Sequence, residues 1–327
     1  MLIKSLMAAA AGLALALASQ YATAAKIKIG FLLPHGGDPF YQVMQQGVEA
    51  AAKDLGVEVV MEIPLVWDVE AQTPLLGSMV ARGDLNYLVT VPTDKNEMIG
   101  PLKSASDHGV KIITVDTFLG DGDYTNGPVR FPISYIGSDN VEGGHIAARG
   151  LAKAIGGKGT VYINATNPLV SSEQGRAKGF KEVMTKEYPD IKVLGPDYNG
   201  DNPNRATQQT AALLAREPSL AGVFGTNVAS AQGAGTAVAN AGLGGHVQVV
   251  AYDATKLAVE LMDKGVVSLV VAQKPFDMGY MAVLFAAANA AGVTSLPRRF
   301  ETGFAIIDKE NVKDPAVARF IYRVPGK

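Results

Sequence analysis

The sequence contains no cysteine. This absence excludes disulfides, cysteine-ligated zinc, iron–sulfur clusters and catalysis by a thiolate. It also argues against a lipid anchor that is attached through a cysteine. A chain without disulfides depends on its hydrophobic core alone, and 327 residues with a hydrophobic content of 48% are enough to build one.

A surplus of either charge is also lacking. Lysine and arginine number 29 against 31 aspartates and glutamates, which gives a formal net charge of -2. The longest basic run is the pair Arg298 and Arg299. Proteins that bind nucleic acids normally carry a basic surplus, so we expect no nucleic-acid partner.

Motifs that carry catalysis or bind cofactors are missing as well. There is no G-x-G-x-x-G after the first predicted strand, no G-x-S-x-G, and no H-E-x-x-H among the four histidines. Residues 156–160 look superficially like a phosphate loop, but they precede a strand, and we interpret them as a helix end and turn. Residues 121–123 lack the later glutamate of a calcium loop. We therefore expect no enzyme, no cofactor and no metal.

Long hydrophobic runs are absent except near the start of the chain. Lys4 is followed by an apolar stretch over residues 6–18, and residues 22–24 read Ala-Thr-Ala. This order is typical of a cleavable signal peptide, whereas a membrane span needs about 20 apolar residues. We predict a signal peptide over residues 1–25 and export to the periplasm.

In the remaining sequence, short apolar runs alternate with amphipathic stretches, and this rhythm occurs twice. The alternation predicts an α/β fold of two doubly wound, Rossmann-like parallel-sheet lobes. The long loop 118–132 is rich in Gly and Asp, and we expect it near a binding site. The polar tail 308–327 has no clear assignment. The predicted strands are 28–33, 57–63, 87–91, 111–115, 133–136, 160–164, 191–194, 221–225, 247–251 and 268–272, and the predicted helices include 40–55, 70–81, 96–107, 172–185 and 204–215.

Polar side chains follow almost every predicted strand, where ligands bind in open parallel sheets. We interpret Thr93 and Asp94 as caps of the next helix, and we assign Asp116 and Asp253 to a binding site. Carboxylates and amides together match the donors and acceptors of a polyhydroxylated molecule. Aromatic residues near these ends fit either the face of a sugar ring or the core; they are Phe40, Tyr41, Trp67 and Tyr198.

Several short motifs occur in an order and spacing that resemble one family, the ribose-binding-like type I periplasmic sugar-binding proteins. They are residues 38–41, 92–94, 113–116, 137–140, 143–144, 175–180, Asn227, 252–253 and 272–275. The resemblance covers essentially the whole mature chain. It implies two lobes, 26–138 with 274–302 and 139–273 with 303–327, joined by a three-strand hinge. The implied crossings lie near Ser138 and Asp139, Gln273 and Lys274, and Gly303.

The resemblance also implies a function. A sugar, sugar alcohol or amino sugar would bind in the cleft between the lobes, and the monomeric protein would deliver it to an ABC transporter permease. Arg176 in particular enters only through the resemblance, because its helix position by itself indicates a surface residue. Trp67 and Thr117 are added to the residues that match the ligand contacts of the family. The full set of predicted ligand contacts is Asp38, Phe40, Tyr41, Trp67, Asp116, Thr117, Arg176, Asn227, Asp253 and Gln273.

Two residues depart from the family pattern. Asp38 stands where ribose-type members have asparagine, and Thr117 stands where many have arginine. Both changes make the cleft more acidic, which favours a polyol or an amino sugar over an acidic sugar.

Three other functions remain open. A sensory binding protein would have the same cleft and would differ only in its partner. A lac repressor-type regulator shares the fold but needs an N-terminal helix-turn-helix, and the signal peptide argues against it. A periplasmic enzyme would need a catalytic set that the sequence does not offer.

Overall fold

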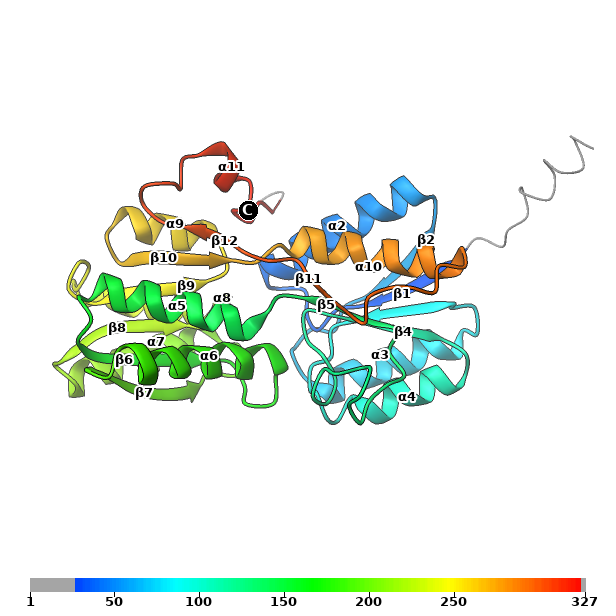
Figure 1. The fold of residues 1–327 in the computed structure, drawn as a ribbon, viewed down its shortest axis with the longest axis horizontal. Coiled ribbons are helices and arrows are strands. Elements are labelled where there is room, and N and C mark those ends of the chain that lie inside the picture. Colours follow the sequence, from blue (N-terminus) through cyan, green and yellow to red (C-terminus); the bar gives the residue numbers. More distant parts are fainter. Residues whose placement is uncertain (1–26, 325–327) are drawn as a thin grey trace, which may run out of the picture.

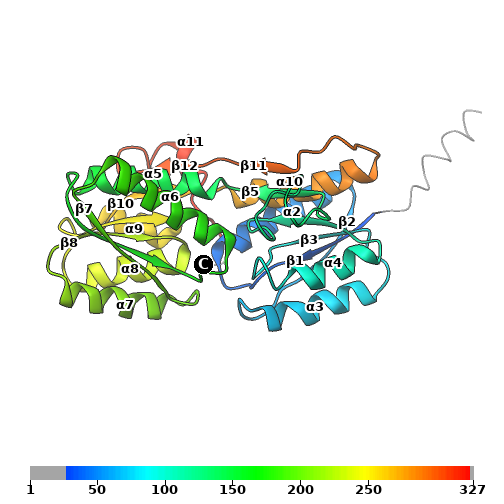
Figure 2. The ribbon, with the colours of Figure 1, turned by 60° about the horizontal axis from the view of Figure 1, so that its bottom comes forward.

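A computed structural model describes residues 27–324 as two α/β lobes that lie side by side (Figure 1). The predicted signal peptide falls outside the described residues. Each lobe is built around its own six-stranded sheet, with helices on both faces (Figure 2). Among the described helices, none combines the length and apolar character that crossing a membrane requires.

The sheet of the first lobe is entirely parallel, in the order β11-β5-β4-β3-β1-β2. Its central strands are buried on both faces, which is why they read as continuous apolar runs. The strands are β1 (Lys28–Leu32), β2 (Glu58–Glu62), β3 (Tyr87–Thr90), β4 (Lys111–Val115), β5 (Ser134–Gly137) and β11 (Arg299–Glu301). The helices are α2 (Pro39–Leu55), α3 (Val69–Ala81), α4 (Ile99–Asp107) and α10 (Pro275–Ala290).

The second sheet has the order β12-β10-β9-β8-β6-β7, and only β12 runs antiparallel to its neighbour. Its strands are β6 (Gly159–Ala165), β7 (Ile191–Tyr198), β8 (Leu220–Gly225), β9 (Gln248–Tyr252), β10 (Val267–Ala272) and β12 (Ala305–Ile307). The helices are α5 (Asn140–Ala154), α6 (Ser171–Glu187), α7 (Pro203–Arg216), α8 (Val228–Asn240), α9 (Lys256–Asp263) and α11 (Pro315–Ala318). The predicted alternation of strands and helices is confirmed, with shifts at the element ends.

The chain passes between the two sheets three times. It crosses after β5 at Ser138 and Asp139, after β10 at Gln273 and Lys274, and between β11 and β12 at residues 302–304. The Ser138 hydroxyl donates a hydrogen bond to Oε1 of Gln273 over 2.8 Å, so two of the crossings are tied together. These connections lie beside one another where the lobes meet (Figure 1).

Helix α2 begins at the lobe interface because of its local sequence. The Asp38 carboxylate accepts a hydrogen bond from the amide of Phe40, and Pro39 occupies the first turn, where its missing amide proton costs nothing. The helix ends at Gly56, whose φ of 64° is the left-handed conformation that glycine adopts without strain. Asp38, Phe40 and Tyr41 are thus fixed at the end of the helix that faces the second lobe.

The loop 118–132 follows the cavity residue Asp116 but does not itself line the cavity between the lobes. Its buried residues Leu119, Tyr124 and Val129 pack into the core of the first lobe. The Tyr124 hydroxyl accepts the amide of Leu119 over 2.9 Å. The amide of Phe118 contacts the second lobe, where it donates to Oγ of Ser171 over 2.9 Å.

Candidate functional site

A cavity lies between the lobes at the carboxyl ends of both sets of strands. Its empty volume is about 350 Å³, counted up to and including its mouth. The lining residues are Asp38, Phe40, Tyr41, Trp67, Asp116, Thr166, Val170, Ser172, Glu173, Arg176, Asp201, Asn227, Asp253 and Gln273.

Two aspartates reach the cavity from opposite lobes. Asp116 follows β4 and Asp253 follows β9, and both are buried with positive φ angles of 63° and 75°. Residues other than glycine rarely adopt this conformation, and such residues concentrate at functional sites. Oδ2 of Asp116 accepts a hydrogen bond from the Tyr41 hydroxyl over 2.8 Å. Oδ1 of Asp253 accepts one from Nε2 of Gln273 over 2.9 Å.

Burial makes these carboxyl groups harder to ionise. It raises the pKa of Asp116 to about 6, although the nearby Arg176 acts in the opposite direction. Burial likewise raises the pKa of Asp253, again opposed by Arg176. The pKa of Asp38 is raised well above its usual value by burial and then by the charges of Asp201 and Asp253. The cavity is therefore rich in carboxyl groups, and a ligand that donates hydrogen bonds to them would stabilise their ionised form.

Arg176 is the cation of this cavity. Its Nε donates to Oδ1 of Asn140 over 2.8 Å, and its Nη1 donates to Oε1 of Glu173 over 3.1 Å and to the carbonyl of Thr226 over 2.9 Å. The guanidinium lies 4.0 Å from the ring centre of Tyr252, which supports it from one side. Nη2 is buried and has no hydrogen-bond partner among the described residues, which leaves it available to a ligand.

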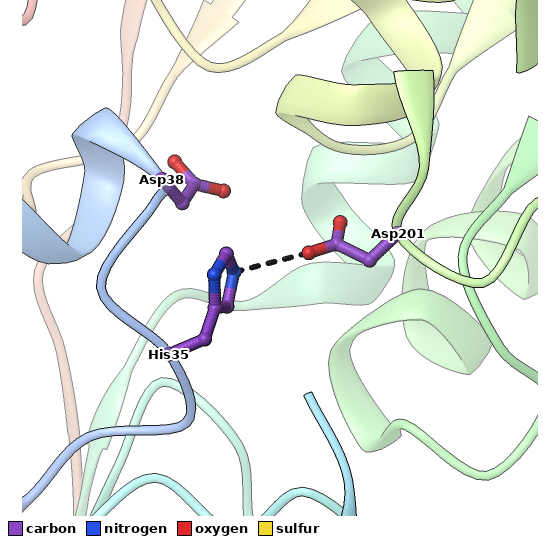
Figure 3. A group of neighbouring side chains, drawn as sticks. All are labelled: His35, Asp38 and Asp201. Atoms are coloured by element: carbon purple, nitrogen blue, oxygen red, sulfur yellow. Dashed lines mark ion pairs between the residues drawn. The ribbon is translucent and has the colours of Figure 1, made fainter. Parts of the chain in front are cut away.

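A side-chain contact joins the lobes at the edge of the cavity, where His35 points across the gap toward Asp201 (Figure 3). Nε2 of His35 lies 3.0 Å from Oδ2 of Asp201. The other oxygen of Asp201 accepts Nδ2 of Asn227 over 2.7 Å. Asp38 stands close by, and one ligand atom from each of His35, Asp38 and Asp201 lies within 4.8 Å of the others. This spacing could hold a cation, but the pairing of His35 with Asp201 already accounts for two of the three groups.

Further contacts hold the lobes together. The amide of Lys95 donates to the carbonyl of Leu169 over 3.3 Å, and Nζ of Lys95 donates to Oε1 of Gln174 over 2.7 Å. With the contact between Phe118 and Ser171, these bonds join the lobes beside the cavity. A ligand in the cavity would therefore be surrounded by residues of both lobes.

Replacing His35 with phenylalanine should weaken ligand binding two- to fivefold, because the contact of its Nε2 with Asp201 is lost and a partly buried polar contact contributes about 1 kcal/mol. The ring would keep its contacts with Tyr41 and Trp67, whose ring centres lie 5.7 and 6.1 Å away. Ligand release measured by stopped-flow should become faster in the variant. An unchanged release rate would mean that the contact between His35 and Asp201 does not hold the lobes together.

Nine of the ten predicted site residues line the cavity, and Thr117 does not. The Thr117 side chain is buried, and its hydroxyl donates to the carbonyl of Pro92 over 2.7 Å, within the first lobe. Asp94 accepts hydrogen bonds from the amides of Asn96 and Glu97 in a turn. Its interpretation as the cap of the next helix is wrong, because α4 begins only at Ile99, after Met98. Sequence reasoning missed the following lining residues: Thr166, Val170, Ser172, Glu173 and Asp201.

The model of a family described as "Periplasmic binding protein domain" matches residues 29–294. The chain belongs to this family. This match confirms the sequence-based resemblance, and with it the α/β fold of two lobes. The family consists of binding and transport proteins.

Curated members of the periplasmic binding protein family give the same result. The chain is 25% identical over 254 residues to a ribose import binding protein of Bacillus subtilis, covering 78% of each chain. It is 27% identical over 246 residues to the D-allose-binding periplasmic protein of Escherichia coli, covering 74% of this chain and 78% of that one.

A solved structure is more similar. It is an ABC transporter solute binding protein from Agrobacterium vitis bound with α-D-tagatopyranose, with 43% identity and a TM-score of 0.88. The match covers 91% of this chain and 100% of that one. A solute binding protein from Agrobacterium radiobacter in complex with D-arabinose matches at 28% identity and a TM-score of 0.84, covering 91% and 100%.

Proposed function

We propose that this periplasmic binding protein captures a single sugar, sugar alcohol or amino sugar between its lobes and delivers it to an ABC transporter permease. The observation that carries the proposal is the closed cavity itself. It brings Asp116 and Asp253, from opposite lobes, together with the unpaired Nη2 of Arg176. The bound α-D-tagatopyranose in the relative from A. vitis supports a monosaccharide of similar size.

The chemistry of the lining matches a polyhydroxylated ring. Hydroxyl groups donate to carboxylates and accept from a guanidinium, so each can be satisfied in a site that excludes water. Trp67 and Tyr41 stand 5.9 Å apart between ring centres and offer an apolar wall for the face of the ring. The excess of carboxyl groups over cations disfavours an acidic sugar, whose own carboxylate would be repelled.

The lobes bounded by residues 26–138 with 274–302 and 139–273 with 303–327 would move about the three crossings. A ligand bridging both lobes favours the closed form, because only that form makes both sets of contacts. We propose export through the signal peptide, action as a monomer and no catalysis. Similarity to sugar transport components favours delivery to a permease over a sensory role.

A thermal-shift screen of the mature protein against pentoses, hexoses, polyols and amino sugars tests this function. A ligand that binds only the folded state adds about 4 kcal/mol of stability at a thousandfold excess over Kd, so a large shift is expected with one or a few compounds. D-tagatose is the first compound to try. No shift with any of them would overturn the carbohydrate assignment.

Intrinsic fluorescence gives a second readout, because Trp67 is the single tryptophan and lines the cavity. Sugar binding should change its emission, and the titration should yield the same Kd as calorimetry. The Trp67→Phe variant should lose the signal but still show a thermal shift. A fluorescence signal that does not saturate with the calorimetric Kd would place Trp67 outside the binding site.

A further inference from the structure

The C-terminal segment 319–324 is anchored in the second lobe next to the cavity. The amide of Tyr322 donates to the carbonyl of Ala254 over 2.8 Å, and the Tyr322 hydroxyl donates to Oδ1 of Asp253 over 2.7 Å. Tyr322 is only 6% exposed. A residue far from β9 along the sequence therefore contacts the aspartate that ends this strand.

The same segment also contacts the first lobe. Nε2 of Gln46, on α2, donates to the carbonyl of Arg323 over 3.1 Å. The ring of Tyr322 meets that of Phe40 edge-on, with centres 6.1 Å apart. Figure 2 shows this end of the chain between the two lobes. The segment is thus a connection between the lobes that does not belong to the three crossings.

We propose that residues 319–324 form an interlobe strap, and that Tyr322 is a positioning residue that orients Asp253 toward the ligand. The inference rests on the proposed function of the cavity. Both hydrogen bonds that the structure gives to the Asp253 carboxylate, from Gln273 and from Tyr322, go to Oδ1. They fix the carboxylate plane and leave Oδ2 for a hydroxyl of the sugar.

The strap also adds stability to the closed form alone. Its adjacent residues Arg323 and Tyr322 are held by Gln46 in one lobe and by Asp253 and Ala254 in the other, so separating the lobes must break one set of contacts. Contacts between the lobes that exist only in the closed form slow the release of the ligand, although they do not involve the ligand itself. Tyr322 and Gln46 should therefore affect binding in different ways.

The pKa of Asp253 provides a readout that would not change if Tyr322 had a purely structural role. Burial raises the pKa of Asp253, whereas Arg176 and the hydrogen bonds from Gln273 and Tyr322 lower it. The other charged or titratable groups that face it are Asp38, Asp116, Tyr252 and Asp201. Removal of the Tyr322 hydroxyl should raise the pKa of Asp253 further. Binding that needs an ionised Asp253 would then decline at a higher pH than in the unmodified protein.

The test compares Tyr322→Phe and Gln46→Ala, with D-tagatose as the probe and calorimetry from pH 5 to 8. Tyr322→Phe should weaken binding on the order of tenfold, as expected for loss of a hydrogen bond to a charged group, and should shift the acidic decline of affinity to higher pH. Gln46→Ala should accelerate release, measured by Trp67 fluorescence, and leave the pH profile unchanged.

Tyr280→Phe is the matched control, because the Tyr280 hydroxyl donates to Oδ2 of Asp54 over 3.2 Å on the outside of the first lobe. It should bind as the unmodified protein does. Affinity and pH profile of Tyr322→Phe equal to those of this control would overturn the positioning role.

If the unmodified protein binds no sugar, the proposed function fails, and hydrogen exchange of residues 319–324 then decides the strap without any ligand. Exchange should be faster in Gln46→Ala than in the unmodified protein. Unchanged exchange would overturn the strap.

Discussion

Replacing Arg176 with alanine is expected to weaken sugar binding at least tenfold, about 1.4 kcal/mol, and to lower the free energy of unfolding by about 3–5 kcal/mol. The first effect follows from the loss of Nη2, the buried donor without a protein partner. The second follows because Glu173, buried beside Arg176, loses its counter-charge. Isothermal calorimetry and urea denaturation measure the two effects separately.

A second substitution separates binding from stability. The Arg176→Ala/Glu173→Gln double variant removes the carboxylate that pairs directly with Arg176, so part of the lost stability should return. The amide of the introduced glutamine can still accept from the amide of Thr166 and from the Thr226 hydroxyl, which both donate to Glu173. Binding should remain weak. A double variant that regains both properties would mean that Arg176 acts only by supporting the fold.

Much of this site could be predicted from the ends of the strands. Asp116, Asp253 and Gln273 directly follow β4, β9 and β10, and the carboxyl ends of parallel strands meet at one edge of a sheet. The two-lobed fold then brings both edges together, so residues found independently in each half of the sequence line one cavity. Local patterning suffices here because backbone direction alone places these side chains.

Residues on helix α6 could not be found in this way. Ser172, Glu173 and Arg176 are polar but buried, because their face of the helix meets the cavity and not the core. Polar residues in a helix normally indicate a face exposed to solvent. Only the family resemblance therefore identifies Arg176 as a site residue, and the sequence analysis does not identify its buried partner Glu173.

Asp201 and Tyr322 carry even less local signal. Asp201 lies in a Gly-Asp-Asn turn that would read as an ordinary surface loop, and Tyr322 lies in the polar tail. Their roles depend on contacts with His35 and Asp253, which are distant in sequence. Thr117 is the opposite case, because it is predicted at the site but does not line the cavity. The positive φ of the preceding Asp116 redirects the chain and turns Thr117 toward Pro92.

Asp116→Asn is expected to weaken sugar binding at least tenfold at pH 7.5 and, at the same pH, to stabilise the ligand-free protein by up to about 3 kcal/mol. In the folded protein, burial raises the pKa of Asp116 from 3.8 to about 6. The carboxyl group therefore holds its proton more tightly in the folded than in the unfolded chain. Its favourable contribution is complete below about pH 4 and is lost as the pH rises through 6.

Asparagine removes the buried charge that the native protein carries above pH 6. Its carbonyl oxygen can still accept the hydrogen bond from Tyr41, so the packing of the cavity wall is retained. Urea denaturation of the ligand-free proteins should show the stabilisation at pH 7.5 and little difference near pH 4. Asp263→Asn, at an exposed aspartate that ends α9, is the control and should change neither stability nor binding.

Binding should depend on pH in the opposite direction to stability. A sugar hydroxyl donates to the ionised Asp116, so the affinity of the native protein should fall as the pH drops below about 6. The asparagine variant should lack this step, which calorimetry between pH 5 and 8 can resolve. Tight binding by Asp116→Asn with an unchanged pH profile would remove Asp116 from the ligand contacts. A stability gain accompanied by weak binding would instead show that the native protein retains a destabilising buried charge because the ligand needs it.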